Sequence, residues 1–528
     1  MSKTANKQNG NHALEIKQAG MSMIEKLMGI FTILVLCVFP VVYHNYYFDI
    51  LETKYHSYCA MTIGVMVVML VYGLYTNKLI EGLRGFCFKK LIKGLNIADW
   101  SVLAFWLATV MSWIVCKWRW EAFWGTSGRY NGVFLISIYT IIYFMVTRFF
   151  VLKRVYLDAF LVVSLFVCML GITDYFQMDL LGFKKMMLDE QKGMYTSTFG
   201  NINTYTIYVG AVLCVSMILY VMETCKKRMA FYFGVMTVTM VALIVGASDN
   251  AYLTLAALFG LSPLVLFRKK TWIRRYLASV ALFMTSIVFV GWINTAYAGI
   301  VFGLDSIFVI LSGFALLPVA TIALWGIILG WKVLEKKSHG DQKDELGKGL
   351  VFFWCVIIAI VVMAVVYVLY DANIAGNAEK YNAIKNYVVF DAEWGTRRGY
   401  VWTCSMELYN QVLDPIHKLF GYGADTFKLL MIRHYPIENN IVFDNAHNEY
   451  IHFLLTIGLF GMVSYIALLA SAVYVMVKRM AGRPEVMAVM FVVIAYATQA
   501  TVNLFLPVIF PVIWQLLAMG LAKTPEEK

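Results

Sequence analysis

Apolar runs of about twenty residues follow one another through most of this chain. An α-helix needs about 20 apolar residues to cross a bilayer, inside which every backbone N–H and C=O must be paired within the structure. Only 14% of the 528 residues are charged, against roughly 25% in soluble domains. The runs therefore predict an all-α polytopic membrane protein with about fourteen transmembrane helices. The predicted spans lie near residues 27–47, 57–76, 99–116, 131–150, 155–176, 203–222, 229–247, 250–267, 276–297, 306–331, 350–370, 447–477, 486–503 and 506–522.

The basic residues are distributed unevenly between the two sides that these spans define. If the N-terminus is cytoplasmic, the predicted inner loops carry 24 Lys and Arg residues and the short outer loops carry 7. Cytoplasmic loops are enriched in Lys and Arg, so this bias supports the arrangement of the spans and predicts that both termini are cytoplasmic. The net charge of +12 then reflects sidedness and does not indicate nucleic-acid binding.

One connection, on the predicted outer face, is about 75 residues long. Loops of this length without a structural reason are usually functional. Within it, apolar residues recur at helical spacing from Arg398 to Leu413 and stop at Asp414-Pro415, which predicts a helix lying at the membrane interface. The predicted organisation is a cytoplasmic tail (1–26), eleven spans (27–370), the large extracytoplasmic loop (371–446), three further spans (447–522) and a cytoplasmic tail (523–528).

The end of this loop, from Phe443 to Tyr450, leads directly into the twelfth predicted span. We expect Asp444 or Asn445 to be the N-cap of that span. His447 would then lie in the first helical turn, where free N–H groups and the helix dipole favour anions and disfavour an imidazolium. A neutral His447 could accept a proton, and the alternative is a histidine that only anchors the membrane interface.

Four short segments form a set with a common order and sidedness. They are FWGTSGRYNG at 123–132, FGNINTYTIYV at 199–209, RRGYVWTCSMELYNQVLDPIHKLFGYGADTF at 397–427 and HNEYIHFLLTIGLFG at 447–461. The last resembles the signature of the O-antigen ligase and O-antigen polymerase superfamily of bacterial envelope glycan transferases. The other three resemble, in order, its Gly/Arg motif, its Gly-Asn-x-Asn element and its Arg, Trp, Pro and Gly-x-Gly-x-x-x-Phe pattern. The resemblance covers most of the chain from about residue 120 onward.

The resemblance implies a glycosyltransferase of cell-envelope polysaccharide biosynthesis in the bacterial cytoplasmic membrane. Such an enzyme moves a glycan from an undecaprenyl-pyrophosphate-type lipid donor to a hydroxyl acceptor on the outer face, with inversion and without a metal or cofactor. The predicted topology favours the same class, because nucleotide sugars and ATP are not available outside and an activated donor must cross within the membrane. The acceptor stays open between another repeat unit (polymerase), a lipid or wall anchor (ligase) and a protein hydroxyl.

A pyrophosphate leaving group needs cations, and four arginines fall on the predicted outer face: Arg129, Arg397, Arg398 and Arg433. Arginine suits this role because its planar guanidinium binds phosphate through two N–H groups and keeps its charge. Each of the four could instead be a solvated loop residue or a headgroup contact, which is least favoured for the Arg397-Arg398 pair. We expect His447 to be the catalytic base, since a neutral imidazole can take the proton of an acceptor hydroxyl.

Four further polar residues are predicted to support this site: Asn201, Asp444, Asn448 and His434. Asn201 either positions the donor or caps the sixth span. Asp444 either orients His447 or serves as a helix cap, and His434 is the rival base on the outer loop.

The hairpin between the seventh and eighth spans departs from the family pattern. Many relatives carry Ser-Arg there, whereas residues 248–250 of this chain are Ser-Asp-Asn. One arginine is therefore missing or replaced near Asp249, and Lys184, Lys185 and Lys192 are candidates to compensate. No metal site is expected, because the outer loop has no Asp-x-Asp or His-x-x-His pair and the nine cysteines are scattered.

The main alternative is a flippase or another transporter of lipid-linked surface polysaccharide. Transporters usually place ionisable groups at mid-membrane and show repeated halves. Here Asp174 and Asp249 lie near outer span ends, no Lys falls inside a predicted span, no Arg lies at the middle of one, and the outer loop has no counterpart in the first half. A scaffold without catalysis would leave the motif around His447 unexplained, so the transferase is preferred.

The charge bias yields a topology prediction. A cysteine at Asn440 should react with a membrane-impermeant maleimide added to intact cells, whereas cysteines at His339 or after Lys523 should react only after permeabilisation. Labelling of Asn440 from the cytoplasm alone would contradict the outer placement of the long loop.

Overall fold

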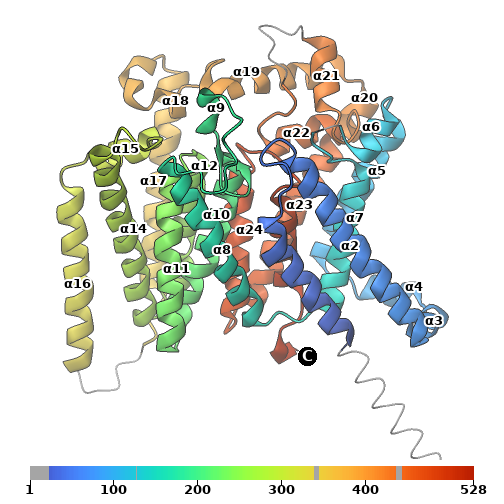
Figure 1. The fold of residues 1–528 in the computed structure, drawn as a ribbon, viewed down its shortest axis with the longest axis horizontal. Helices are drawn as coiled ribbons and strands as arrows, with labels where there is room; N and C mark the ends of the chain where they lie inside the picture. Colours follow the sequence, from blue (N-terminus) through green and yellow to red (C-terminus); the bar gives the residue numbers. More distant parts are fainter. Residues whose placement is uncertain (1–22, 127, 338–343, 436–442, 528) are drawn as a thin grey trace, which may run out of the picture.

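The computed structural model describes residues 23–126, 128–337, 344–435 and 443–527. Long helices run between its two ends, and shorter helices cover the end drawn uppermost in Figure 1. The described residues form one small sheet, in which β1 (Tyr195–Thr196) pairs antiparallel with β2 (Gly200–Asn201). The protein is therefore an all-α polytopic membrane protein, as the apolar runs predict.

Ten helices among the described residues are long and apolar enough to cross a bilayer, and four shorter apolar helices accompany them. The ten are Met23–Val41, α2 (Ile50–Tyr75), α5 (Ile97–Val115), α8 (Arg154–Tyr175), α10 (Ile202–Met222), α11 (Lys226–Val245), α14 (Lys270–Ala296), α16 (Leu317–Lys337), α17 (Gly349–Asn373) and α23 (Gly458–Arg479). The four are α7 (Val133–Phe149), α12 with α13 (Asn250–Leu261 and Pro263–Leu266), α24 (Pro484–Gln499) and α25 (Phe510–Leu521). Each predicted span overlaps one of these helices.

The remaining elements are short. The first long helix ends in a π-helical turn, η1 (Leu34–Val38), and a 3-10 turn, η2 (Phe39–Val41). The others are α3 (Lys78–Arg84), α4 (Phe88–Lys93), α6 (Arg119–Trp124), α9 (Asp189–Lys192), α15 (Ser306–Ser312), η3 (Ala378–Ile384), α18 (Lys385–Val388), α19 (Trp394–Glu407), η4 (Leu408–Val412), α20 (Pro415–Phe420), α21 (Phe427–His434), α22 (Glu449–Thr456) and η5 (Pro525–Glu527). The helix predicted from Arg398 to Leu413 is thus formed by α19 and η4.

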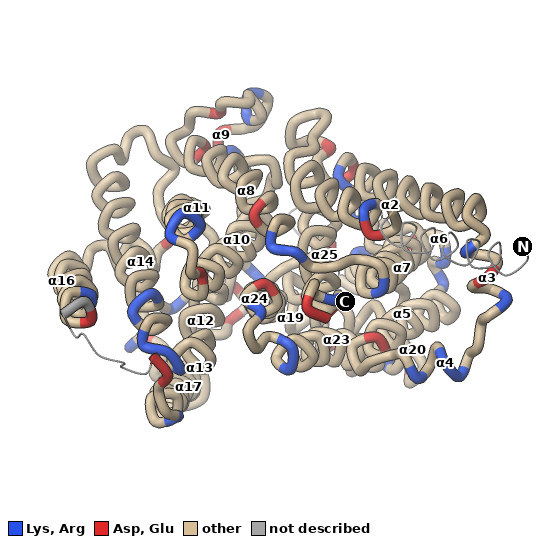
Figure 2. The backbone as a smooth tube through the Cα atoms, turned by 90° about the horizontal axis from the view of Figure 1, so that it is seen from below, with Lys and Arg blue, Asp and Glu red and all other residues tan. Residues whose placement is uncertain are grey.

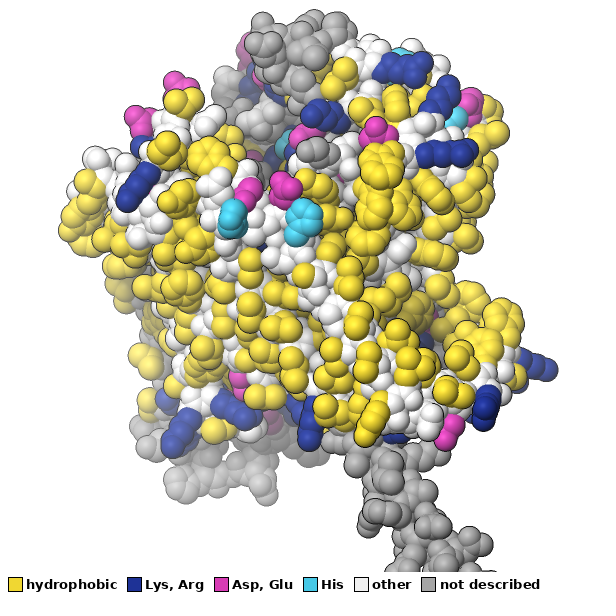
Figure 3. Space-filling model, turned by 45° about the vertical axis from the view of Figure 1, so that its right-hand side comes forward, with side chains coloured by type: hydrophobic (Ala, Val, Ile, Leu, Met, Phe, Trp, Pro, Cys, Tyr) yellow, Lys and Arg dark blue, Asp and Glu magenta, His cyan; other side chains and the backbone are white. Residues whose placement is uncertain are grey.

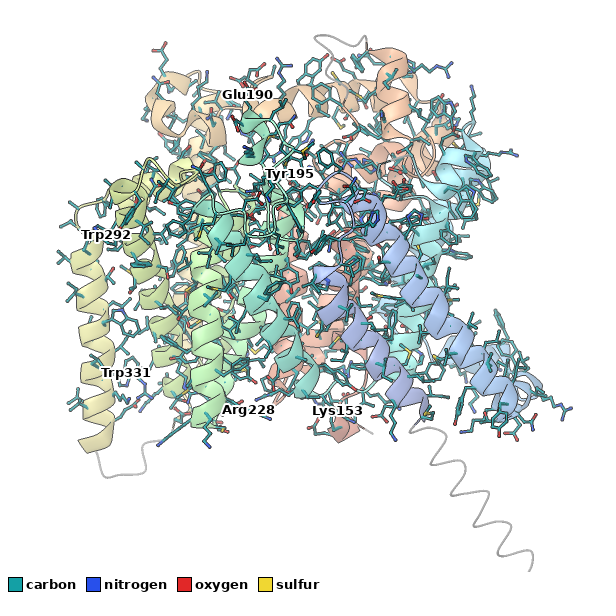
Figure 4. The ribbon with its side chains drawn as sticks, viewed as in Figure 1. Lys153, Glu190, Tyr195, Arg228, Trp292 and Trp331 are labelled. Atoms are coloured by element: carbon teal, nitrogen blue, oxygen red, sulfur yellow. The ribbon has the colours of Figure 1, made fainter. Side chains whose placement is uncertain are left out.

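The predicted inner and outer loops separate to opposite ends of the molecule. Figure 4 places Lys153 and Arg228 at the lower end, and Glu190 and Tyr195 at the upper end. Basic residues gather in the loops of the lower end (Figure 2), and Figure 3 shows a hydrophobic band between the charged groups of the two ends. The C-terminal segment is held at the lower end, where Leu152 donates its N–H to the Lys523 carbonyl at 2.8 Å. Positions 339 and 440 lie outside the described residues.

The helices differ in how deeply they are packed. In the apolar stretch of α10, 89% of the residues are buried inside the protein, whereas in the apolar stretch of α17 none is. The helix α10 is therefore central, and α17 presents apolar side chains along its length, as expected of a helix that faces lipid.

The twelfth predicted span, 447–477, is wrong as a single helix. It is broken into α22 and α23 at Gly458, whose φ is +79°. The turn at Gly421 lies against this break so closely that a Cβ on Gly458 would come within 2.3 Å of the Leu419 carbonyl oxygen. Backbone N–H groups of Tyr422 and Gly423 donate to the last carbonyls of α22, those of Leu455 and Thr456, both at 3.0 Å. These bonds satisfy the end of α22 and make a continuous helix impossible.

Two other boundaries also differ from the prediction. The tenth span, 306–331, is divided into α15 and α16 by a turn near Gly313. The second span begins at Ile50 and not at 57, so Lys54 lies inside α2. Its buried ammonium donates to the carbonyls of Phe39 and Pro40, both at 3.0 Å. The prediction that no lysine lies inside a span is wrong here, because the helix extends beyond its apolar run.

Candidate active site

The cap of α22 lies four residues beyond the predicted Asp444 and three beyond Asn445. The side chain of Asn448 accepts hydrogen bonds from the backbone N–H groups of Tyr450 and Ile451 at 3.0 and 3.1 Å. Asn448 is therefore the N-cap, and the prediction that Asp444 or Asn445 would cap this helix is wrong. Because the Asn448 side chain already accepts from the N–H groups of Tyr450 and Ile451, these two groups are not free to bind an anion.

His447 precedes this cap and does not lie in the first helical turn that the sequence predicts. Its φ is +50°, an uncommon value for a residue with a side chain. Two contacts hold it there: its N–H donates to Asn445 Oδ1 at 3.0 Å, and Trp402 Nε1 on α19 donates to the Ala446 carbonyl at 2.9 Å. The outer-loop helix α19 thus fixes the chain immediately before His447.

Arg129 and Asp444 join two segments that are far apart in the sequence. Both Nε and Nη2 of Arg129 donate to Asp444 Oδ2, at 3.0 and 2.6 Å. The Arg129 side chain is 16% exposed, so this pair is more strongly coupled than a surface ion pair. Asp444 therefore positions an arginine and does not cap a helix.

Asp425, which follows the Gly421 turn of the outer loop, holds the segment around Arg129 from inside. Its buried Oδ2 accepts hydrogen bonds from the backbone N–H groups of Thr126 and Asn131, at 2.7 and 3.1 Å, and from the Thr126 hydroxyl at 3.1 Å. Burial raises the pKa of Asp425 to about 6, although these hydrogen bonds oppose the shift. Gly125, with φ +93°, is required in this loop because a Cβ there would meet the Tyr130 backbone.

The two neighbouring arginines of α19 have different environments. Arg398 is buried, and its Nε has no hydrogen-bond partner among the described residues. Burial lowers the pKa of Arg398, and the charge of Asp249 opposes that shift. Arg397 is 41% exposed and lies 3.6 Å from Glu393. Its φ of +70° belongs to a distorted turn at Gly395–Arg397. Only Arg398 of this pair reaches the interior.

Four charged or titratable groups converge at this point: His447, Arg129, Arg398 and Asp444, which we call the His447 cluster. Burial, together with the charges of Arg398 and Arg129, lowers the pKa of His447 to about 4, although the charge of Asp444 acts in the opposite direction. The imidazole is therefore neutral at pH 7. The cause is burial beside two arginines, and not the helix dipole that the sequence suggests.

Other predicted site residues do not join this cluster. Arg433 and His434 are exposed on α21, and no hydrogen bond or ion pair links them to the cluster within the described part of the chain. Asn201 caps α10, because its side chain accepts a hydrogen bond from the Asn203 N–H at 2.8 Å. Of the two roles that the sequence allowed for Asn201, the structure thus has the helix cap. Two of the lysines considered as replacements for the missing arginine are paired with acids: the ammonium of Lys184 lies 3.7 Å from the Asp174 carboxylate, and that of Lys192 lies 2.6 Å from the Asp189 carboxylate.

Two buried acids near the cluster were not assigned a role from the sequence. Asp425 lies in the Gly-x-Gly-x-x-x-Phe pattern, and that position was the available signal. Glu449 is fully buried, and Tyr465 and Tyr496 donate to its two carboxyl oxygens at 2.5 and 2.7 Å. It thereby anchors α22 to α23 and α24.

Among the residues that the structure describes, no three His, Cys, Asp or Glu side chains are grouped as metal ligands.

A groove of about 410 Å³ lies along α19 on the outer loop. It is lined by aromatic side chains with a polar rim, among them Phe390, Trp394, Tyr400, Trp402 and Thr403. Trp402 also holds the Ala446 carbonyl, so the groove and the His447 segment share a residue. Aromatic rings with nearby polar groups are typical of sites that bind small polar ligands.

The role of Asp425 can be tested by substitution. Asp425→Ala should leave the buried N–H groups of Thr126 and Asn131 without acceptors, at a cost of about 2–4 kcal/mol. We expect a lower midpoint of thermal unfolding in detergent and reduced protection of residues 125–132 from proteolysis. Asp414→Ala, which removes the exposed cap of α20, is the matched control and should have a smaller effect. An unchanged midpoint in Asp425→Ala would contradict the anchoring role.

Comparison with known proteins agrees with the motifs. Residues 298–466 match the family model described as O-antigen ligase. That segment contains Arg398, Asp425 and His447, whereas Arg129 and Asp249 lie before it. A search of curated proteins finds no match. The resemblance to the O-antigen ligase and polymerase superfamily that was drawn from the sequence is confirmed over this segment.

Proposed function

We propose that the protein transfers a glycan from a polyprenyl pyrophosphate, of the undecaprenyl type, to an acceptor hydroxyl at the upper end of the molecule. The match of residues 298–466 to the O-antigen ligase family supports glycan transfer of this general type. The observation that carries the finer proposal is the neutral His447 imidazole held beside the Arg398 and Arg129 guanidinium groups. A base and phosphate-binding cations thus lie together.

In this mechanism, His447 takes the proton of the acceptor hydroxyl while the acceptor oxygen attacks the anomeric carbon of the donor sugar. The bond between that carbon and the phosphate oxygen breaks, and the electron pair leaves on the pyrophosphate. Attack and departure occur on opposite faces of the carbon, so the configuration inverts. Arg398, with an unpartnered Nε, supplies positive charge and hydrogen bonds to the leaving group.

The proposed orientation follows from the charge of the two ends. The lower end carries the basic loops (Figure 2), which supports a cytoplasmic position for that end in a bacterium and an outer position for the His447 cluster at the cytoplasmic membrane. The donor's lipid chain would remain in the bilayer. The aromatic groove along α19 is our candidate for acceptor binding, because aromatic faces pack well against the apolar faces of sugar rings.

The decisive experiment is to incubate the purified protein, in proteoliposomes, with an undecaprenyl-pyrophosphate-linked oligosaccharide and candidate acceptors. Mass spectrometry then identifies which glycan, lipid or peptide gains the transferred mass. Failure of every acceptor class to gain mass, while the donor still binds, would contradict the proposal.

The two arginines of α19 should differ in importance. Arg398→Ala should reduce transfer by about 10²-fold or more, the order seen when a positioned electrostatic contact is lost. Lysine at 398 should restore only part of the rate, because an ammonium cannot reproduce the two-pronged contact. The matched control is Arg397→Ala, whose side chain is exposed, and we expect it to stay within a few-fold of wild type. Equal losses for both variants would contradict the distinct roles.

His447 should determine the acid limb of the chemical step. His447→Ala should keep expression and donor binding but lower transfer by about 10²- to 10⁴-fold. His434→Ala, on exposed α21, is its control and should transfer normally. In single-turnover measurements, the wild-type rate should fall as the pH drops toward the low pKa of His447, about 4, because protonation removes the base. An acid limb that persists unchanged in His447→Ala would assign it to another group.

A further inference from the structure

A helical hairpin at the lower end of the molecule, formed by α3 and α4, is exposed along almost its whole length. Every residue from 80 to 94 is exposed. In Figure 1 the two helices lie to the side of the helix bundle, near the level at which the long helices end, and in Figure 2 they lie at its periphery. The α3–α4 hairpin therefore contacts the surroundings of the protein near the lower boundary of the hydrophobic band.

Large apolar side chains make up much of this exposed surface. Phe86 and Phe88, at the turn of the hairpin, are 60% and 66% exposed. The exposed large apolar residues of the hairpin are Ile80, Leu83, Phe86, Phe88, Leu91 and Ile92. Such a concentration of exposed apolar side chains is uncommon on a surface that faces water, and it indicates contact with lipid or with a partner.

The charge of the hairpin favours lipid. Residues 78–93 contain five basic residues and one acid, which are Lys78, Arg84, Lys89, Lys90, Lys93 and Glu81. Short helices that combine apolar and basic side chains lie in the plane of the membrane interface, where the apolar groups enter the bilayer and the basic groups reach the headgroups. With seven and six residues, α3 and α4 are too short to cross the bilayer, which takes about 20 residues.

A hollow of about 330 Å³ lies between the hairpin and the end of α7. Its cationic side chains are Lys90 of α4 and Arg148 of α7, and three glycines, Gly82, Gly85 and Gly94, line it without side chains. The hollow thus presents two cations beside exposed backbone, next to the apolar surface of the hairpin.

Arg148 is held at this hollow by a buried acid. Its Nη2 donates to Asp99 Oδ2 at 2.6 Å, and the Tyr143 hydroxyl donates to Asp99 Oδ1 at 2.9 Å. The side chain of Asp99 also accepts from the backbone N–H of Asn96 at the start of α5. Because Asp99 compensates one of the two positive charges, Lys90 and Arg148 leave the hollow with one net positive charge.

We propose that the α3–α4 hairpin and Arg148 form a binding site for an anionic glycerophospholipid of the surrounding bilayer. The lipid phosphodiester, with its single negative charge, occupies the hollow and accepts hydrogen bonds from Lys90 and Arg148. The acyl chains remain in the bilayer beside the apolar side chains of the hairpin. The other basic residues of the hairpin favour a headgroup with net negative charge over a zwitterionic one. A soluble phosphate would leave the exposed Phe86 and Phe88 rings in water, so the occupant is a lipid. This inference does not depend on the proposed glycan transfer.

The test measures which lipid lies against the hairpin in the full-length protein. A fluorophore is attached at Ile92→Cys, which is on the hairpin but does not line the hollow, in a chain whose exposed Cys87, Cys225 and Cys355 are serine. The protein is reconstituted in phosphatidylcholine vesicles that contain the same mole fraction of brominated phosphatidylglycerol or brominated phosphatidylcholine. Phosphatidylglycerol should quench more strongly, with a relative binding constant about fivefold or more above that of phosphatidylcholine, the factor typical of one basic residue near an anionic surface.

Two neighbouring lysines provide a matched pair of variants. Lys90→Gln should remove most of the preference for phosphatidylglycerol, because Lys90 lines the hollow, whereas the adjacent Lys89→Gln, which does not, should keep most of it. Both residues are exposed, so neither substitution should prevent folding. Lys226→Gln, exposed at the start of α11 on the same end, should leave the preference unchanged.

Three outcomes would overturn the inference. Equal quenching by the two lipids, or equal losses in Lys89→Gln and Lys90→Gln, would show that the hollow does not select an anionic lipid. Absence of quenching by both lipids would place the hairpin outside the bilayer or beneath another protein. Loss of the preference on addition of inorganic phosphate, but not of sodium chloride at the same ionic strength, would assign the hollow to a soluble phosphate.

Discussion

The backbone contact between the Gly421 turn and the break at Gly458 is the constraint on which the upper end depends. A Cβ on either glycine would lie within 2.3 Å of the opposing backbone, so both positions require the absence of a side chain. The contact pairs Tyr422 and Gly423 with the end of α22, and Ser112 of α5 adds a hydroxyl bond of 2.6 Å to the Thr456 carbonyl. The buried turn of the outer loop is thereby tied to the neighbouring helices.

The electrostatics of the His447 cluster depend on that attachment. Asp425 follows the Gly421 turn directly and holds the 125–132 loop from within, which brings Arg129 to Asp444. Arg398 arrives separately on α19, whose Trp402 holds the chain before His447. Each charged group therefore comes from a different segment. Their common position is produced by buried backbone hydrogen bonds, which cost much more to break than exposed ion pairs.

The parts of this arrangement that depend on local sequence were predictable. Apolar runs located the ten long helices and the four shorter apolar ones of the described residues, and spacing located the helix that contains Arg398. The long-range parts were not. The sequence of residues 447–477 alone does not indicate that Gly421 lies against Gly458, so the helix break was missed. His447 was therefore predicted in the first turn of a helix, whereas it precedes the N-cap of α22. Arg397 and Arg398 are adjacent and identical in type, and only the distorted turn at Gly395 decides which of them is buried.

The same arginines act on both sides of the proposed reaction. A positive guanidinium beside His447 lowers the pKa of the imidazole, which keeps the base neutral but also weakens it, because a base of low pKa takes a proton less readily. As charge develops on a leaving phosphate, that phosphate would offset the field of the arginines, and the affinity of His447 for a proton would rise during the step itself. Proton transfer and bond cleavage would then assist each other, so in the proposed reaction a donor bound at Arg398 would be required before His447 became an effective base.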